Sequence, residues 1–389
     1  MTILGIFLIN QIRTGGDRRY IELLELLAEH ENNVIVIMNS FLDYTPKYIK
    51  QILLSVKYTR HRLPPASYLF KKSIKKYFNT IKAHSELSSI DFIHIHGDIY
   101  LKSAIFLKKK LNIPFFYASR CNDIDRARII RATGKLTAKE YIFSLLNIPI
   151  NRHREKQISK FSELVTFQNI QDKDIFLSRN MNFTNKTVII PGNIGLPRCT
   201  TASENKNNSK KINKILAVDS TSISKGLLIL INVLLCLKNE GYNYLHCTIL
   251  GRNDDKMLFK YINKYNLSDM VSVDGYRDPF PYFVSHDLLL YPTLYDSYPD
   301  TVLEAIHTGC PVLASSVGGL PDMLHYPELL FDPYNMKQIV DKIKQCIENL
   351  EYYMNIKKLC KERAIYHHFN WEEKFEKAMS DYILINNKG

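Results

Sequence analysis

Short runs of apolar residues recur through the first half of the chain, with segments of helical spacing between some of them. In the segment Tyr20–His30, the side chains of Ile21, Leu24 and Leu27 fall on one face, which predicts an amphipathic helix. Strands that alternate with helices predict βαβ units and a parallel sheet. Six apolar runs are predicted to be short buried strands: Ile3–Ile9, Val34–Met38, Phe92–His96, Phe115–Ala118, Leu164–Phe167 and Val188–Ile190.

A polar segment then interrupts this pattern. Thr200–Lys211 has no periodicity and has the composition of an interdomain linker. Beyond it the alternation returns, beginning with a strand at Ile215–Val218 and an apolar helix at Gly226–Asn239. Four more buried strands are predicted at His246–Leu250, Val271–Val273, Leu288–Tyr291 and Val312–Ser315.

This organisation predicts an α/β protein with two doubly wound, Rossmann-like domains, which suits a length of 389 residues. The first domain is expected at 1–198, the linker at 199–212 and the second domain at 213–370. The tail repeats apolar residues at helical spacing and predicts a closing helix, 371–389, that packs back toward the first domain. Its apolar positions are Trp371, Phe375, Met379 and Ile383.

Charge is concentrated in the first half of the chain. Residues 1–200 carry 31 Lys and Arg against 16 Asp and Glu, whereas residues 201–389 carry 21 against 23. A basic half favours an anionic partner, which could be a substrate, an acidic membrane surface or nucleic acid. No DNA- or RNA-binding motif is present, so no nucleic-acid partner is predicted.

One basic stretch has the pattern of a helix that lies on anionic lipid, although an ordinary surface helix has a similar pattern. An apolar face would be opposite a face of lysines. The apolar face would hold Phe70, Ile74, Tyr77, Phe78 and Ile81, and the basic face Lys71, Lys72, Lys75, Lys76 and Lys82.

Targeting and redox signals are sparse. Met1–Asn10 is apolar but lacks the basic start and cleavage site of a signal peptide, so a first strand is predicted. The most apolar run, Gly226–Leu237, is shorter than the roughly 20 residues that a membrane span needs. The seven cysteines form no CxxC pair, which favours a reducing compartment. We therefore expect a cytoplasmic protein, soluble or peripheral at the inner face of the membrane.

Three glycine-containing turns follow predicted strands, and none belongs to a GxGxxG motif, which disfavours a nicotinamide dehydrogenase. At such turns, backbone amides and the positive end of a helix can hold phosphate or lie close to a sugar. The turns are Gly15-Gly16, Lys225-Gly226 and Gly318-Gly319.

The segment Asp296–Glu304 (DSYPDTVLE) places two carboxylates eight residues apart after a buried strand. A helix is predicted from Thr301 and is closed by Gly309. Free amides at the helix start, from Tyr298, Asp300 and Thr301, would suit a diphosphate. An ordinary helix start with Asp300 as N-cap would explain the presence of Asp300, but it would explain neither Asp296 nor Glu304.

The segment from Val273 to Leu324 resembles the C-terminal domain of the retaining glycosyltransferases of family 4. The shared pattern is a strand, a Pro-Thr turn, two acids eight residues apart, a Gly-x-Pro-Val strand and a Gly-Gly turn. This chain has Asp296 where the family usually has Glu. The matching positions are Pro292-Thr293, Asp296, Glu304-Ala305, Gly309-Cys310-Pro311-Val312 and Gly318-Gly319.

The resemblance implies the GT-B fold, in which two Rossmann-like domains face each other, and it assigns roles to residues of the second half. Asp296 would face the transferred sugar, Glu304 the ribose hydroxyls, and Lys225 beside Gly226 the diphosphate. Ser220 stands where the family usually has an Arg, and Arg252 or Arg277, next to Tyr276, would supply that charge.

In the first half the resemblance covers Gly15-Gly16, which would let the backbone approach the donor phosphate, and Asp91–Gly97, a strand with two histidines. His94 reads as an interior residue, and His96 lies at the strand end on the acceptor side together with Asp123. Arg120 stands where the family has a His that contacts the donor sugar. It would bind a hydroxyl or a phosphate.

Asp123-Ile124-Asp125 also has the DxD pattern of metal-dependent transferases of another fold, but that fold would leave residues 213–320 unexplained. No metal and no cofactor are therefore expected. The donor would be a UDP- or GDP-sugar, and the acceptor a glycan or a lipid-diphosphate-linked glycan of a cell-surface polysaccharide. Two alternatives remain: a nucleotide-sugar epimerase on the same fold, and a catalytically weak binding module.

Overall fold

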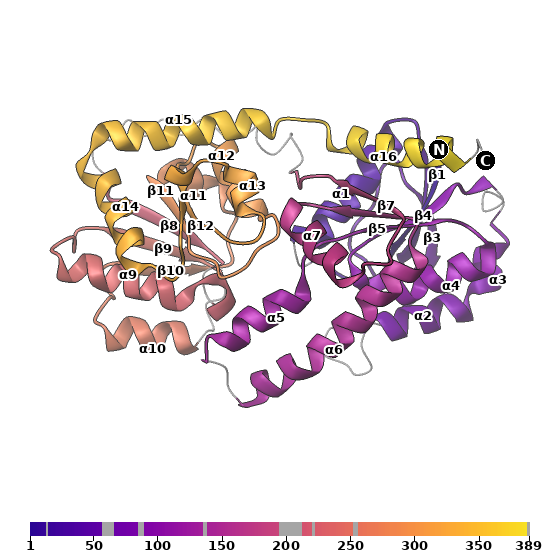
Figure 1. Cartoon of the computed structure of the whole chain (residues 1–389), viewed down its shortest axis with the longest axis horizontal. Helices are drawn as coiled ribbons and strands as arrows, with labels where there is room; N and C mark the ends of the chain where they lie inside the picture. The colour runs from indigo at the N-terminus through magenta and orange to yellow at the C-terminus, as the bar shows by residue number, and fades with distance from the viewer. Residues whose placement is uncertain are drawn as a thin grey trace. The chain divides into compact units, whose positions relative to one another are not determined.

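The computed structural model of the chain describes residues 1–12, 15–56, 66–84, 89–134, 138–193, 212–219, 222–251 and 256–386. The chain divides into two compact units (Figure 1). The first unit comprises Met1–Asn122, Pro149–Pro191 and Asn370–Gly389, and the second comprises Asp123–Ile148 and Gly192–Phe369. Of the predicted linker, 199–212, only Ile212 lies among the described residues.

The first unit contains a seven-stranded parallel sheet in the order β3-β2-β1-β4-β5-β6-β7. Its strands are β1 (Thr2–Phe7), β2 (Asn33–Asn39), β3 (Lys50–Leu54), β4 (Phe92–His96), β5 (Phe115–Ala118), β6 (Leu164–Phe167) and β7 (Lys186–Ile189). Its helices include α1 (Gly15–Glu29), α2 (Ala66–Lys76), α3 (Phe78–Lys82), the short η2 (Asp98–Tyr100), α4 (Leu101–Leu111), α7 (Ile170–Arg179) and α16 (Trp371–Asn386).

The six predicted strands of this half are present, and β3 is an addition. β3 lies at the sheet edge, where only Ile52 and Leu54 are buried and the other three residues are exposed. β3 begins with the polar Lys50 and Gln51, and its apolar Leu53 is exposed, so its sequence marks a buried strand less clearly than those of the central strands do.

Tyr20 on α1 joins β1 to β4 at the point where the strand order reverses. The pairing of these strands ends at Gly5 opposite His94. One residue further on, the Ile6 amide donates to the Tyr20 hydroxyl over 3.2 Å, and this hydroxyl donates to the His94 carbonyl over 2.7 Å. A side chain thus completes the hydrogen bonds of two diverging strands.

Removing this hydroxyl should weaken the first unit. We expect Tyr20→Phe to lower the free energy of unfolding by about 1–3 kcal/mol, because a buried amide and a buried carbonyl lose their shared partner. Urea unfolding would measure this loss. Tyr68→Phe, at a tyrosine 50% exposed on α2, is the matched control and should change stability little. Equal effects of the two substitutions would contradict the bridging role.

The apolar stripe proposed for membrane contact is part of the protein core. Phe70, Ile74 and Ile81 are fully buried, and the Phe70 ring stacks on Tyr100 with the ring centroids 5.6 Å apart. The stretch forms two helices, α2 and α3, rather than one. Of the two readings, the helix on lipid does not hold for this stripe, because α2 packs its apolar face on α4 and η2 as an ordinary surface helix does.

The second unit contains a six-stranded parallel sheet in the order β10-β9-β8-β11-β12-β13. Its strands are β8 (Lys214–Val218), β9 (His246–Leu250), β10 (Val271–Gly275), β11 (Leu288–Tyr291), β12 (Val312–Ser315) and β13 (Leu330–Phe331). Its helices include η3 (Ile223–Lys225), α9 (Leu227–Asn239), α10 (Lys256–Lys264), α11 (Phe280–Ser285), α12 (Asp300–His307), α13 (Leu320–Leu324), η4 (Pro327–Leu329), α14 (Met336–Glu348) and α15 (Leu350–Tyr366).

The five predicted strands of the second half are present, and the two-residue β13 is an addition. The two sheets have the same strand order up to the sixth strand. In each sheet the order in which strands are added reverses beside the first strand, between β1 and β4 and between β8 and β11. This confirms the predicted α/β class with two doubly wound sheets. In such sheets, ligands bind outside the carboxyl ends of the strands at the reversal.

Two further helices follow β5. Helix α5 (Asp123–Ala132) lies in the second unit, and α6 (Ala138–Phe161) is a long helix that contains Pro149 (Figure 1). Among the described residues, no helix is long and apolar enough to cross a membrane. The last helix, α16, packs on the first sheet, where Phe375 contacts the His94 ring with the centroids 5.7 Å apart.

Candidate active site

Three loops meet at the carboxyl edge of the second sheet. The chain leaves the adjacent strands β8, β11 and β12 there, and the strand order reverses between β8 and β11. The loop after β8 leads to Lys225 and Gly226, the loop after β11 to Asp296, and the loop after β12 to Gly318. The fold therefore brings the predicted donor residues of three distant segments to one edge.

Lys225 and Asp296 form an ion pair at this edge. The Lys225 Nζ lies 2.5 Å from the Asp296 Oδ2. The Tyr291 hydroxyl, at the end of β11, donates to the same oxygen over 2.9 Å and accepts from Lys225 Nζ over 3.2 Å. Lys225 keeps 31% of its side chain exposed and Asp296 keeps 17%. The cluster is thus reachable from solvent.

The electrostatics keep the lysine charged. Burial lowers the pKa of Lys225, but the carboxylate of Asp296 and then Tyr291 raise it to well above its ordinary value. Burial, followed by the charge of Asp296, also raises the pKa of Tyr291. At neutral pH this cluster therefore presents a cation, an anion and a neutral hydroxyl. A diphosphate would compete with Asp296 for the lysine.

Two glycines let these loops touch. Gly226 has φ +85°, and a Cβ there would lie 1.9 Å from the Pro292 carbonyl oxygen. Gly318 has φ +58°, and a Cβ there would lie 1.9 Å from the carbonyl oxygen of Asp296. The Gly319 amide donates to that same oxygen over 3.0 Å. Asp296 is thus held by its backbone as well as by its carboxylate.

Helix α12 begins at Asp300, one residue before the predicted start, and Pro299 is its N-cap. Glu304 lies in this helix and is only 4% exposed. The Tyr298 side chain, just before the helix, is buried and lies 3.4 Å from His367 Nδ1 through its hydroxyl. The start of the helix, with Asp300 and Thr301, therefore follows a loop that the buried Tyr298 side chain anchors.

Four further donor-binding candidates were predicted in the second half. Ser220 and Arg252 fall outside the described residues. Tyr276 and Arg277 follow β10 at the same sheet edge, and Tyr276 is 74% exposed. β10 is two strands from β8, a separation of roughly 10 Å.

In the first unit, Arg120 lies over the Gly-Gly turn. A Cβ on Gly16 would lie 1.8 Å from Arg120 Nη2, and a Cβ on Gly97 would lie 2.4 Å from Arg120 Cδ. The guanidinium also pairs with Asp17, Nη1 to Oδ1, at 3.2 Å. The space beside Gly16, next to Gly15 at the start of α1, is thus filled by the chain's own arginine. A phosphate could contact Gly16 only if this side chain shifted.

The two histidines of β4 are interior residues that face the same side of the sheet. Both rings pack on Tyr20, with centroid distances of 5.6 Å for His94 and 5.7 Å for His96. Burial lowers the pKa of His94 to about 3. Burial, then the charges of Arg120 and Arg19, lowers the pKa of His96 to well below its usual range. Both are neutral at physiological pH.

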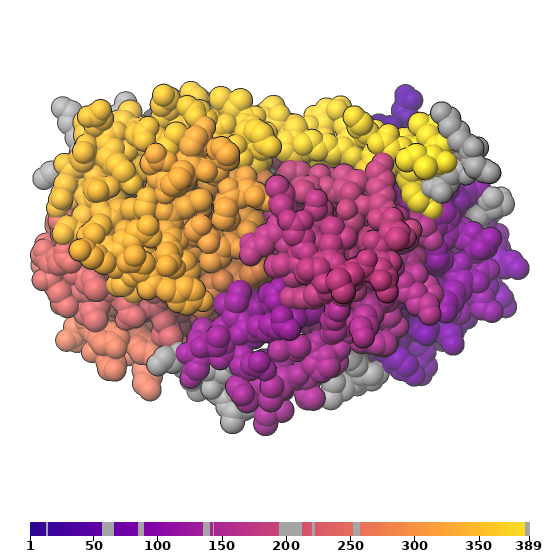
Figure 2. All heavy atoms as spheres, in the orientation of Figure 1, coloured from indigo at the N-terminus to yellow at the C-terminus, as the bar shows by residue number. Residues whose placement is uncertain are grey.

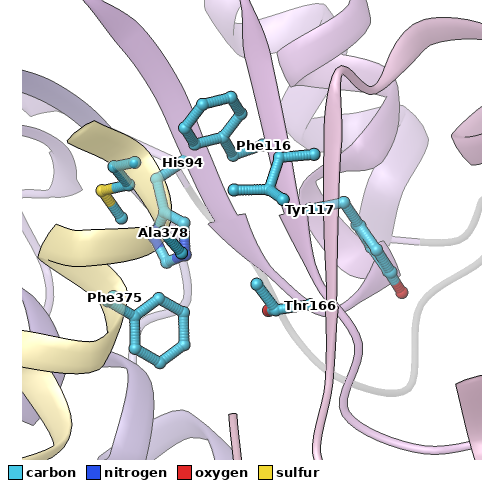
Figure 3. A pocket seen from close by; sticks show the side chains of 8 residues that line it. His94, Phe116, Tyr117, Thr166, Phe375 and Ala378 are labelled. Carbon is cyan, nitrogen blue, oxygen red and sulfur yellow. The ribbon is translucent and has the colours of Figure 1, made fainter. Parts of the chain in front are cut away.

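A cavity of about 10 Å³ lies beside His94, between β4, β5, β6 and α16. Figure 3 shows His94, Phe116 and Phe375 around it, with Thr166 on a neighbouring strand. This space holds at most about one water molecule. It is therefore too small for a sugar or a nucleotide, and the candidate site lies elsewhere.

Asp123 and Asp125 begin α5 and pair with arginines of the same helix. The closest oxygen–nitrogen distances are 3.1 Å to Arg126 and 3.3 Å to Arg128. Among the described residues, no group of three or more His, Cys, Asp or Glu side chains could hold a metal ion. The DxD pattern is accounted for by ion pairs one helical turn apart.

Residues 200–363, which include the Lys225 cluster, match the family described as glycosyl transferases group 1. This part of the chain is therefore a glycosyltransferase group 1 domain. Among its relatives are protein CapJ of Staphylococcus aureus, 30% identical over 45% of this chain and 46% of CapJ, and a capsular polysaccharide biosynthesis glycosyltransferase, CapH of S. aureus, 23% identical over 59% of this chain and 60% of CapH. The glycosyltransferase thus aligns with only about half of the length of these relatives.

Solved structures share its fold over nearly the whole chain. Sucrose-phosphate synthase from Thermosynechococcus elongatus has a TM-score of 0.77 and 17% identity, with 100% of both chains covered. The Anabaena HepE protein, in a crystal structure with UDP, has a TM-score of 0.68 and 15% identity, with 98% and 100% covered. The fold of this glycosyltransferase is accordingly GT-B, as the sequence predicted.

Some residues that build the site of the glycosyltransferase were not singled out from the sequence. Tyr291 was predicted only as a strand residue, yet its hydroxyl holds Asp296. Thr293 joins two loops, since its hydroxyl donates to the Ser224 carbonyl over 3.2 Å. His367 lies far along the chain, and its Nδ1 is 3.4 Å from the Tyr298 hydroxyl. The Pro-Thr turn signalled Thr293, but no pattern marked Tyr291 or His367.

Proposed function

We propose that this enzyme transfers a sugar from a nucleotide diphosphate sugar, UDP- or GDP-linked, with retention of configuration, as a transferase of the family 4 type. The Lys225–Asp296 pair at the strand reversal of the second sheet carries the proposal. Lys225 would neutralise the diphosphate, and Asp296 would accept hydrogen bonds from the transferred sugar. Glu304 would accept bonds from the ribose hydroxyls.

In the proposed reaction the enzyme acts on the leaving group. The bond between the sugar and the diphosphate breaks, and negative charge grows on the phosphate oxygen next to Lys225. A cation held there favours the transition state over the ground state. The acceptor oxygen bonds to the anomeric carbon on the face that the diphosphate leaves, and the leaving phosphate takes the proton of the acceptor hydroxyl, so no separate base is needed. The lysine and the amides at the start of α12 supply the positive charge, and the proposal requires neither metal nor cofactor.

The proposed acceptor is a growing glycan, free or linked to a lipid diphosphate, in the synthesis of a cell-surface polysaccharide. Support for this acceptor comes from CapH, whose name places it in capsular polysaccharide biosynthesis. The structure of HepE, which contains UDP, supports a UDP-linked donor. The basic first half, with 31 Lys and Arg against 16 Asp and Glu in residues 1–200, suits an anionic acceptor at the inner face of the membrane.

Donor binding tests the proposal. We expect UDP or GDP and one of their sugars to raise the melting temperature, because a ligand at 100 times its Kd adds about 2.7 kcal/mol of stability. Glu304→Gln should weaken nucleotide-sugar affinity by about 10- to 100-fold in calorimetry, because a charged acceptor of hydrogen bonds is lost.

Glu351→Gln is the matched control, since Glu351 is exposed on α15 in the same unit. It should bind the donor like the wild type. Failure of every nucleotide sugar to bind would overturn the proposed function. Binding that is unchanged in Glu304→Gln would instead overturn the role of Glu304.

A further inference from the structure

Helix α6 exposes a set of large apolar side chains. Tyr141 is 45% exposed, Ile142 57%, Leu145 42% and Leu146 58%. We call these four residues the α6 stripe. The ten residues 141–150 that contain it include no charged side chain. Figure 2 shows the spheres of α5 and α6, purple to magenta, at the lower part of this face.

The stripe has helical spacing. At about 100° per residue, the four side chains fall within an arc of roughly 140°. Ser144 lies outside this arc and is buried at 8% exposure, with its hydroxyl donating to the Tyr141 carbonyl over 2.7 Å. The helix thus turns a small polar residue inward and its large apolar residues outward. Such a reversal indicates a surface with a partner, because an ordinary surface helix has the opposite orientation.

The positive charge near the α6 stripe favours an anionic partner. Within the second unit, residues 123–148, which hold α5 and the first part of α6, carry five Lys and Arg against three Asp and Glu. Arg126 and Arg128 are exposed on α5. A second copy of this chain would bring the same positive charge and would be repelled. An anionic bilayer offers the opposite charge together with an apolar interior.

We propose that the α6 stripe inserts into the surface of an anionic lipid bilayer, while the neighbouring basic side chains contact the lipid headgroups. This deepens the proposed function, because it places the enzyme at the membrane that would carry a lipid-linked acceptor. It also assigns lipid contact to α6 in place of α2, whose apolar face is covered by the protein itself. The binding step itself needs no donor.

Vesicle sedimentation tests the proposal. The full-length protein should bind phosphatidylglycerol-containing vesicles more strongly than pure phosphatidylcholine vesicles, and added salt should weaken this binding. Ile142→Ser/Leu146→Ser should lower the partition coefficient by about 30-fold or more, because two large apolar side chains no longer leave water.

Leu350→Ser/Met354→Ser is the matched control, since these α15 residues are 50% and 53% exposed. It should bind vesicles like the wild type. Lack of wild-type binding, or equal losses in both double variants, would overturn the proposal. So would light scattering that shows a dimer which Ile142→Ser/Leu146→Ser dissociates, because the stripe would then bind a second copy. Lys225→Met should still bind vesicles, which separates failure at the membrane from failure of transfer.

Discussion

Lys225→Met is expected to lower kcat/KM for sugar transfer by about 100- to 1000-fold, as the loss of one group that stabilises transition-state charge typically does. The lysine is a cation that lies against the Asp296 carboxylate. Its loss would leave the charge growing on the diphosphate without a partner at that position. Methionine keeps the length and the apolar stem, so packing changes little.

A fold defect must be distinguished from the loss of charge. Tyr291 still donates to Asp296 in Lys225→Met, so the loop keeps one of its two contacts with this carboxylate. Lys225→Arg should retain part of the activity, and Lys337→Met, at an exposed lysine of α14, should retain all of it. Steady-state kinetics with the donor identified by thermal shift would measure these values. A loss below about threefold in Lys225→Met would rule out the electrostatic role.

Gly318→Ala is expected to lower the free energy of unfolding by about 3 kcal/mol or more. A left-handed residue other than glycine costs about 1–2 kcal/mol. The added Cβ would also lie 1.9 Å from the Asp296 carbonyl oxygen, a backbone atom that can move away only with its loop. Because that loop carries the Asp296 carboxylate, donor affinity should fall together with stability.

Gly134→Ala separates the two causes. Gly134 has φ +63°, close to the +58° of Gly318, and nothing lies within 4 Å of a Cβ at that position. Gly134→Ala should therefore lower the free energy of unfolding only by the cost of the left-handed conformation, about 1–2 kcal/mol, and donor affinity should not change. Urea unfolding with both variants would measure the difference. Equal losses of stability would show that the loops do not depend on their contact at Gly318.

Most of the fold could be predicted from the sequence because nine of the eleven predicted strands lie inside parallel sheets, with only β7 and β10 at the edges. A strand covered on both faces is a continuous apolar run, as in Leu288–Tyr291. The two strands that were not predicted lack this signal. Lys50–Leu54 is an edge strand that is buried on one side only, and Leu330–Phe331 has two residues.

The candidate site could be predicted in part, through turns that leave a local mark. Lys225, Asp296 and Gly318 each follow a strand, and the structure brings their loops together. No local sequence pattern indicated the contacts between these loops. The ion pair of Lys225 joins residues 71 positions apart, and Arg120 reaches Asp17 across 103 positions. Pairs at these separations depend on strand order, which no local pattern encodes.

By itself, the sequence determined the class of the fold, the two sheets and the loops that carry the candidate donor residues, because periodicity and turn residues act locally. Only the tertiary structure decided which apolar faces are covered. Phe70 and Ile74 had the pattern of a lipid-facing helix and are in the core, whereas Ile142 and Leu146 are exposed. Burial depends on which elements pack against a helix, and those elements come from distant parts of the chain.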